Sequence, residues 1–242
     1  MDNGYLYAEA QRANAAKDQF LATLSHEIRT PLNAIVGWLS MVRHPEVLSP
    51  TGMPKAWAAI DRNAEALTGL IEDLLDVSRI ATGKLHLAQI DVDINEVVRD
   101  SVRSLEPAFE EKHVSLSVAL QPQRCNVRGD AARLRQVAVN LLSNAMKFTA
   151  SGGQVEVRVT CDDAAVVLAV RDTGIGIHPT FLPHVFERFR QGNGDSTTGL
   201  GLWLAIVKNL VELHGGSVAA TSDGVGRGAQ FTVTLPRKTT AS

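Results

Sequence analysis

The sequence predicts a chain of two parts, an all-α helical hairpin followed by an α+β domain. Between Tyr7 and Ala81, apolar side chains recur at steps of three and four, which is the period of a helix with one apolar face. After Gly83 the pattern changes, and short segments of alternating apolar residues mix with helical ones. Because the strands and helices do not alternate regularly, an α+β domain is favoured over a parallel α/β sheet.

The composition is that of a packed protein. The chain has 242 residues, of which 45% are hydrophobic and 21% charged, and its net charge is −2. That charge argues against a broad basic surface for nucleic acid or anionic lipid. No apolar run approaches the roughly 18 residues that cross a bilayer, and the first residues lack an apolar signal core. We therefore expect a cytoplasmic chain with no nucleic-acid partner and no direct membrane contact, whether or not the full-length protein is membrane-anchored.

The chain contains only two cysteines, Cys125 and Cys161. Two are too few for a disulfide scaffold or for a four-cysteine zinc site. We expect both to be buried and reduced, as is usual in a cytosolic protein.

The first helix is predicted from Tyr7 to about Met41. Its apolar stripe comprises Phe20, Leu24, Ile28, Leu32, Ile35, Leu39 and Val42. Pro31 interrupts the stripe and is expected to bend the helix, because proline removes a backbone hydrogen bond. The segment His44–Pro54 holds three prolines and a glycine, and it is predicted to be a connecting loop.

The second helix is predicted from about Pro54 to Ala81, with Gly83 as its stop. Its apolar positions form a heptad seam of Ile60, Ala64, Leu67, Ile71, Leu74, Ser78 and Ala81. Two helices alone bury little surface, so we expect the hairpin to pair with a second copy in a homodimeric four-helix bundle. The alternative is a hairpin that packs on the rest of its own chain.

The remaining elements follow from their periodicity. Helices are predicted at Ile94–Glu111, Ala131–Phe148 and Gly199–His214, and strands at Val114–Leu120, Val155–Val159, Ala164–Val170, Ser217–Ala220 and Gln230–Leu235. The segment Asp172–Thr198 is rich in glycine and proline and is predicted to be a long loop. A loop of that length in a compact domain usually has a function.

His26 lies in the segment FLATLSHEIRTPLN of the first helix. A neutral imidazole is a nucleophile at pH 7, and the adjacent Glu27 can accept the proton of one ring nitrogen. Thr30 lies four residues further along and shares the helix face of His26, where its hydroxyl can hold a water or a phosphoryl oxygen. Taken alone, a His-Glu pair is usually an ordinary pair of surface residues.

The stretch SHEIRTPL, however, resembles the H-box of sensor histidine kinases of two-component systems. The resemblance implies that His26 is the phosphoacceptor, that Glu27 is the activating base and that Thr30 takes part in a reverse phosphatase reaction. It also implies that the phosphoryl group passes from His26 to an aspartate on a response-regulator receiver domain. The helical hairpin matches the dimerisation and phosphotransfer domain of that family.

A second cluster lies in the helical segment RLRQVAVNLLSNAMKFT. Asn140 and Asn144 share a helix face, and Lys147 follows about one turn later. Amide oxygens suit Mg²⁺ and an ammonium suits phosphate, although two surface amides on a helix are also common without a ligand. The segment resembles the N-box of the same kinases and of related ATPases. That resemblance implies that Asn144 binds Mg²⁺ with Asn140 near the metal, that Lys147 contacts phosphate and that Phe148 lines the adenine pocket.

A third signal is the segment VRDTGIGI, in which Asp172 ends an apolar strand and is followed by Gly174 and Gly176. Glycines let the backbone approach a ligand closely, although such a pair often marks only a turn. The segment resembles the first glycine box of these kinases, which implies that Asp172 accepts a hydrogen bond from the exocyclic amine of adenine.

The segment FERFRQ resembles the F-box of the family's nucleotide lid. The resemblance implies that Phe186 and Phe189 pack the lid against the domain. Arg188 and Arg190 are candidate phosphate contacts, and the alternative is a solvated charged face.

The segment TGLGLWLAIVKNLVELHGG places Gly199, Gly201 and Leu202 ahead of a helix whose first amides can bind phosphate. It resembles the second glycine box. Trp203 departs from that pattern, because it stands where the box often has glycine or another small residue. Either Trp203 crowds the phosphates, or Gly199 and Gly201 are the operative pair, and we favour the latter.

The resemblance covers about residues 15–236. It implies a signalling-helix linker from an upstream sensor domain at residues 1–18, a dimerisation and phosphotransfer domain at 19–83, and an ATP-binding domain of the Bergerat α+β sandwich type at 84–242, with a hinge near Ala81–Lys84. The implied function is that of a protein-histidine kinase core that uses ATP and Mg²⁺. Two alternatives are a kinase-deficient ATP-binding signalling module or scaffold, and an ATPase machine like the heat-shock chaperones.

Overall fold

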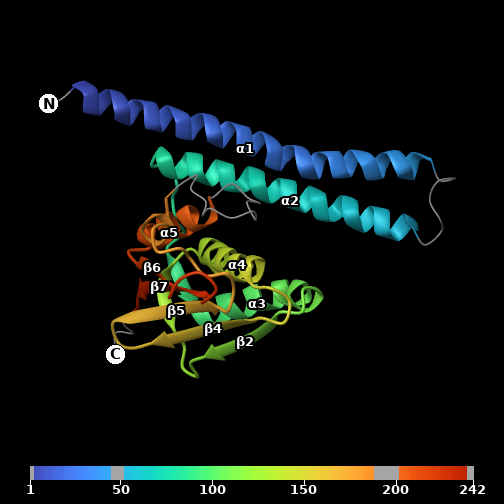
Figure 1. Ribbon diagram of the computed structural model, residues 1–242. Coiled ribbons are helices and arrows are strands. Elements are labelled where there is room, and N and C mark those ends of the chain that lie inside the picture. Colours follow the sequence, from blue (N-terminus) through green and yellow to red (C-terminus); the bar gives the residue numbers. More distant parts are fainter. Residues whose placement is uncertain (1–2, 45–51, 188–201, 239–242) are drawn as a thin grey trace. The chain divides into compact units, whose positions relative to one another are not determined.

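The computed structural model of the chain describes residues 3–44, 52–187 and 202–238 (Figure 1). It divides into two compact units, and the chain passes from the first to the second between Gly83 and Lys84. Among the described residues, no helix is both long enough and apolar enough to cross a membrane.

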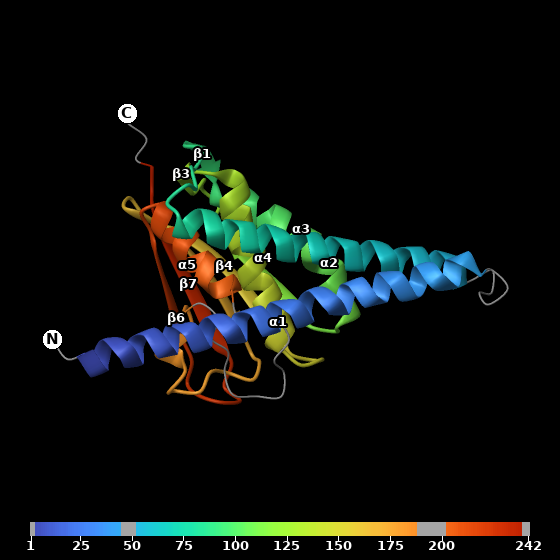
Figure 2. The same cartoon turned by 90° about the horizontal axis from the view of Figure 1, so that it is seen from above.

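The first unit is a hairpin of the helices α1 (Asn3–Arg43) and α2 (Gly52–Ala81). The two lie side by side in both views, and Figure 2 shows them converging toward the end where α1 stops and α2 begins. Helix α1 continues through Pro31. The predicted loop between the helices falls largely on residues 45–51, which lie outside the described part of the chain.

Helix α2 ends where the sequence predicts. The last helical residue is Ala81, and Gly83 adopts a φ of 64°, a left-handed conformation that favours glycine. Of its apolar residues, Ala56 and Ala59 are buried, whereas Ile71 and Leu75 are each 48% exposed. Burial in the hairpin of one chain therefore leaves part of the apolar surface of α2 uncovered.

The second unit is a sandwich of one helical layer on one mixed sheet. The sheet order is β2 (Ser115–Leu120), β4 (Gln154–Cys161), β5 (Ala165–Asp172), β7 (Ala229–Pro236) and β6 (Ser217–Thr221). Strand β2 is parallel to β4, and the other neighbours are antiparallel. The helices are α3 (Ile94–Glu111), α4 (Ala131–Phe148) and α5 (Trp203–Leu213), and a short 3₁₀ turn spans Leu182–His184. The α+β sandwich is confirmed.

The core of this unit follows the alternation of the strands. One face of β4, β5 and β7 is apolar and buried against the helices. Its residues are Val155, Val157, Val159, Val166, Leu168, Val170, Phe231, Val233 and Leu235. Helix α4 contributes the buried Leu134, Leu141 and Leu142, so its core face is fixed and its opposite residues are directed away from the sheet.

A small second sheet was not predicted. Strands β1 (Ile90–Asp93) and β3 (Asn126–Gly129) pair antiparallel, and Figure 2 shows them next to each other. Each has only four residues, which is too short for an alternating pattern to stand out from a loop. Their pairing places Asp93 and Asp130 at the starts of α3 and α4, where both carboxylates accept hydrogen bonds from helix N–H groups.

The two cysteines are buried as expected, but the expectation that they are reduced is wrong in this structure. Cys125, just before β3, and Cys161, at the end of β4, are joined by a disulfide with a Cα–Cα distance of 5.8 Å. The number of cysteines in a sequence cannot reveal this pairing. The fold creates it, because it places the start of β3 opposite the end of β4 across a separation of 36 residues.

Candidate functional site

His26 lies on α1 with its side chain in solvent. The side chain is 77% exposed, whereas that of Glu27 is 15% exposed, and His26 Nδ1 lies 4.0 Å from Glu27 Oε1. That distance is too long for a hydrogen bond, but a small side-chain rotation closes it, and catalytic pairs are often loose before the substrate binds. The imidazole is therefore open to a phosphoryl donor and has a carboxylate beside it.

Thr30 shares the helix face of His26, as its spacing predicts, but its hydroxyl has a backbone partner. Thr30 Oγ1 donates a hydrogen bond of 3.1 Å to the carbonyl of His26. Bonds of this kind are common for threonine within helices. Any contact between Thr30 and a phosphoryl group or water therefore requires the side chain to rotate away from the helix.

Helix α4 holds the predicted amides of the second unit. Asn140 is 9% exposed, and its Nδ2 is buried without a hydrogen-bond partner in the described structure. Native proteins rarely leave such an atom unpaired, so an unpaired amide in a site points to a missing ligand or ion. Asn144, one turn later, is half-buried. Since the two ends of an amide are interchangeable by rotation, Asn140 suits either a phosphate or a hydrated Mg²⁺ ion.

The C-terminal end of α4 meets the loop that follows β5. Ile175 N–H donates to the carbonyl of Phe148 over 3.2 Å. A Cβ built on Gly174 would lie 2.3 Å from the same carbonyl oxygen, so only glycine fits there. Beside this contact, Lys147 Nζ lies 5.0 Å from the centre of the Phe148 ring. The fold thus brings together two segments that the sequence identifies separately.

Asp172 ends β5 in a buried position, with 5% of its surface exposed. Gly174 N–H and Ala229 N–H donate to its Oδ1 at 2.8 and 3.3 Å. Burial raises the pKa of Asp172 above its usual range, although these two backbone donors act in the opposite direction. Both of these bonds go to Oδ1, so Oδ2 remains to accept a hydrogen bond from a ligand amine.

The loop between β6 and β7 supports the first glycine box, and sequence reasoning missed it. Ser222 Oγ accepts a hydrogen bond from Ile177 N–H at 3.0 Å and donates to the Gly228 carbonyl at 2.7 Å. Two backbone bonds add to this, from Gly226 N–H to the Ile175 carbonyl and from Gly228 N–H to the Gly174 carbonyl. The glycine-rich segment SDGVGRG could have indicated this supporting loop. Between two strands, however, such a segment resembles an ordinary turn.

Lys112 is a second residue that sequence reasoning missed. It follows α3, and its Nζ donates to the carbonyls of Met146 and Lys147 at 2.7 and 2.8 Å. These carbonyls belong to the last turn of α4, where a cation complements the helix dipole. Lys112 therefore fixes the end of α4 that carries Lys147 and Phe148.

The lid is only partly described. Phe186 is half-buried and packs edge-to-face on Phe231 of β7, with ring centres 6.2 Å apart, as the F-box predicts. Leu202 is buried and Trp203 is the first residue of α5. The remaining predicted lid and phosphate residues lie outside the described residues: Arg188, Phe189, Arg190, Gly199 and Gly201.

Taken together, the second unit offers a nucleotide-type site. It has a buried carboxylate that can accept from an amine, a glycine loop held close to a helix end, and on that helix amides and an ammonium, groups that suit a metal ion and phosphate. The first unit offers an exposed nucleophilic imidazole. These are the two parts of a phosphotransfer enzyme.

Family comparisons agree with this division. Residues 16–83 match the model of the His Kinase A (phospho-acceptor) domain, and residues 129–239 match that of the histidine kinase-, DNA gyrase B- and HSP90-like ATPases. The chain belongs to the sensor histidine kinases of two-component signalling and carries both domains of a histidine kinase core.

Individual relatives support the same assignment. The circadian input-output histidine kinase CikA of Synechococcus elongatus is 39% identical over 96% of this chain and 31% of its own length. The solved structure of the mycobacterial sensor histidine kinase MprB is 32% identical, with a TM-score of 0.55 over 63% of this chain and 100% of its own. Full-length ShkA in complex with AMPPNP is 32% identical, with a TM-score of 0.67 over 92% of this chain and 46% of its own.

The chain is short beside its curated relatives. It spans about a third or less of the length of the relatives it matches. In three of them it covers 31%, 18% and 25% of the relative's length.

Proposed function

We propose that this core autophosphorylates His26 from ATP and passes the phosphoryl group to an aspartate of a response-regulator receiver domain, in the cytoplasm and as a homodimer. The observation that supports the proposal most directly is His26 itself. It lies 77% exposed within the segment that matches the phospho-acceptor model, in a chain that also carries an ATPase-type site. We further propose that the core reverses the signal as a phosphatase of the same regulator, with Thr30 taking part.

In the proposed reaction, the imidazole Nε2 of His26 attacks the γ-phosphorus of ATP. The bond from that phosphorus to the bridging oxygen breaks, ADP leaves, and a P–N bond forms. Glu27 accepts the proton of Nδ1, so the ring stays neutral as it becomes phosphorylated. An aspartate of the receiver domain then attacks the phosphorus, the P–N bond breaks, and Glu27 returns the proton to Nδ1, so His26 leaves as a neutral imidazole.

The site residues have distinct proposed roles. Asp172 Oδ2 accepts from the adenine amine and selects adenine, while Phe148 lines the pocket. Lys147 contacts phosphate, and Asn144 holds Mg²⁺ with Asn140 beside it, which fits the unpaired amide of Asn140. Mg²⁺, when bound, neutralises charge on the β- and γ-phosphates. Arg188, Arg190, Gly199, Gly201 and Leu202 are proposed to complete the phosphate side.

Transfer of label from γ-³²P-ATP tests this proposal. Wild type should acquire acid-labile, base-stable label, whereas His26→Gln should acquire less than about 1% of it, because no other side chain supplies the nucleophile. Label retained on His26→Gln would contradict the role of His26. The control is His44→Gln, a histidine at the end of the same helix, which should label normally.

The same experiment separates the alternatives. Bound nucleotide without label on wild type would indicate a kinase-deficient signalling module or scaffold. Sustained ATP turnover without any phosphoenzyme would indicate a chaperone-like ATPase.

A further inference from the structure

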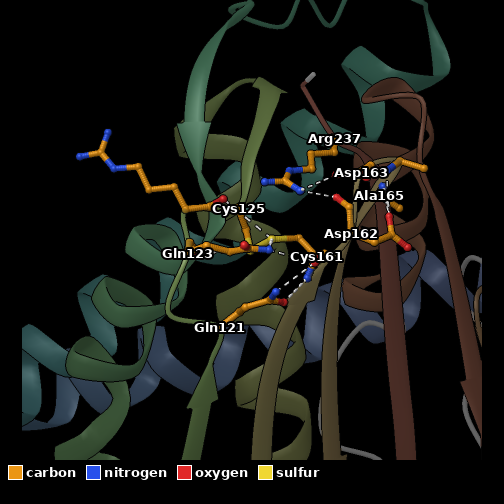
Figure 3. Close-up of polar contacts among 10 residues, drawn as sticks. Gln121, Gln123, Cys125, Cys161, Asp162, Asp163, Ala165 and Arg237 are labelled. Carbon is orange, nitrogen blue, oxygen red and sulfur yellow. Dashed lines mark hydrogen bonds and ion pairs between the residues drawn. A yellow bond between two sulfur atoms is a disulfide. The ribbon is translucent and has the colours of Figure 1, made fainter. Parts of the chain in front are cut away.

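The disulfide lies at a corner of the ATP-binding domain, away from the nucleotide site. Cys161 pairs with Val166 at one end of the β4–β5 hairpin, and Asp172 lies at the other end. The two ends are six residue steps apart along each strand, which amounts to about 20 Å. Figure 3 shows the disulfide beside Gln121 and Gln123, with the β4–β5 turn and Arg237 next to it.

The disulfide closes a covalent loop around the part of the chain that carries the N-box. The 36-residue separation between the cysteines contains β3, α4 and β4 in full. Asn140, Asn144 and Lys147 all lie within it. Closing such a loop restricts the unfolded chain and so stabilises the folded domain.

The two cysteines are held opposite each other by contacts that do not involve sulfur. The Gln121 side chain accepts from Cys161 N–H at 2.6 Å and donates to the Cys161 carbonyl at 3.1 Å. Cys125 N–H donates to Asp93 Oδ1 at 3.3 Å, and the Asn95 amide donates to the carbonyls of Gln121 and Gln123. These contacts hold the backbone at both cysteines, so after reduction the bond can reform without rearrangement of the backbone.

The two cysteine residues differ slightly in exposure. Cys125 is fully buried, whereas Cys161 keeps 8% of its surface exposed, and its Sγ lies 3.7 Å from Nε2 of the exposed Gln123. We therefore expect a small reagent to reach Cys161 before Cys125, once the Gln123 side chain moves aside.

We propose that Cys125 and Cys161 form a reversible thiol–disulfide site. The disulfide stabilises the folded ATP-binding domain under oxidising conditions, and its reduction lowers the stability of the domain under reducing ones. This inference rests on the proposed function in one respect, namely that an ATP-dependent core works in the cytoplasm. Thiol systems keep most cysteines reduced there, and a disulfide in that compartment is usually transient and redox-responsive.

The chemistry requires a disulfide oxidant such as glutathione disulfide. The Cys161 thiolate attacks one sulfur of the oxidant, forms a mixed disulfide and expels one thiolate. The Cys125 thiolate then attacks Cys161 Sγ, forms the protein disulfide and expels the second thiolate. The protein loses two electrons and two protons, and the oxidant is reduced to two thiols.

The test uses the whole 242-residue chain in glutathione buffers that range from fully reduced to fully oxidised. Alkylation after unfolding should count two thiols in the reduced protein and none in the oxidised one. The melting temperature of the ATP-binding domain should rise by about 5–10 °C on oxidation. Two thiols at every buffer ratio, or oxidation without a rise in melting temperature, would overturn the proposal, and both readings need only wild type.

Variants locate the chemistry. Cys125→Ala should hold one glutathione on Cys161 as a mixed disulfide, detected by mass spectrometry, whereas Cys161→Ala should hold little on the buried Cys125. The opposite preference would contradict the order of attack. The double alanine variant should melt at one temperature in both buffers. Running His26→Gln in parallel separates the two proposals, because its thiol count and melting shift should equal those of wild type whether or not the chain is a kinase.

Discussion

Asp172, the proposed partner of the adenine amine, is buried at a cost to folding. The residue is 5% exposed, and its carboxylate accepts from two backbone N–H donors, both on Oδ1. Burial nonetheless raises its pKa, so the folded domain holds a charge that it disfavours. A buried carboxylate with a raised pKa is typical of a binding site in which a ligand donates a hydrogen bond to it.

The change Asp172→Asn should separate binding from stability. The amide keeps an oxygen for Gly174 N–H and removes the buried charge, so the domain without nucleotide should melt at a higher temperature at pH 7 than wild type. ATP affinity should fall at least about tenfold, since a charge-assisted hydrogen bond is lost. Calorimetry and nucleotide titration measure both. The control Asp163→Asn, an exposed carboxylate in the β4–β5 turn, should change neither.

The pH dependence of this effect has a definite sign. Between the usual carboxyl pKa and the raised pKa of Asp172, the folded domain binds more protons than the unfolded chain. This residue's contribution to stability therefore falls as pH rises through that window and stays at its lower value above it. The melting difference between Asp172→Asn and wild type should grow from about pH 4 upward, and a difference that is constant with pH would contradict the assignment.

At the scale of elements, the site depends on how the end of α4 is held. Three features converge there: Lys112 on the last carbonyls of α4, Ile175 N–H on the Phe148 carbonyl, and the β6–β7 loop behind the glycine box. None of them contacts α4 through its core face. These polar contacts add to the core packing of the helix, which in the last turn comes from the buried Ala145.

Replacing Lys112 should therefore loosen the site and the helix together. Lys112→Met should lower the free energy of unfolding of the ATP-binding domain by about 1–2 kcal/mol and raise the KM for ATP, because it removes the ammonium donor from the carbonyls of Met146 and Lys147. Urea titration and autophosphorylation kinetics measure the two effects.

Two control variants test whether the loss in Lys112→Met comes from the lost hydrogen bonds. Lys112→Arg should restore most of the stability and the KM, since a guanidinium can also donate to two carbonyls. Lys208→Met, which removes an exposed lysine from α5, should cost less than about 0.5 kcal/mol. An equal loss in Lys112→Met and Lys208→Met would count against the role of Lys112.

At the scale of the whole molecule, the hairpin leaves apolar residues of α2 uncovered. Ile71 lies on the predicted heptad seam and is 48% exposed, as is Leu75. A heptad seam that its own hairpin does not cover favours pairing with a second copy.

Light scattering on the chain at micromolar concentration should therefore give twice the 26.0 kDa chain mass. Ile71→Glu should shift the mass toward that of one chain, because a charge in the seam loses its hydration on pairing. Glu72→Lys, at the next position on the exposed surface, should leave the dimer intact. A monomeric wild type would argue against the four-helix bundle.

Much of the fold followed from local patterns. The bounds of α3 and α4 and the strands β4 to β7 agree with the periodicity within a few residues, because aliphatic alternation and helix period are properties of neighbouring residues. Strands β1 and β3 were missed because each is stabilised by its distant partner. The end of α2 near Gly83 was also predicted, because a glycine stop depends on the conformation of a single residue.

The candidate site residues also divide into those that local motifs reveal and those that only the fold reveals. His26, Asn140, Asn144, Lys147 and Asp172 were identified as candidates from short motifs, since their spacing on one helix face or at a strand end is local, and their roles stay predictions. Lys112 and Ser222 were not found, because their contacts lie at sequence separations of 34 residues or more to α4 and 45 to the glycine box.

The sequence by itself determined the two-domain order, the helical and strand elements and the motifs of a histidine kinase, because all of these are written in neighbouring residues. Tertiary structure alone decided three things: the support of the α4 end by Lys112, the clamp of the β6–β7 loop on the glycine box, and the Cys125–Cys161 disulfide. Each depends on two segments that meet only when the sheet has formed, and so no local pattern encodes it.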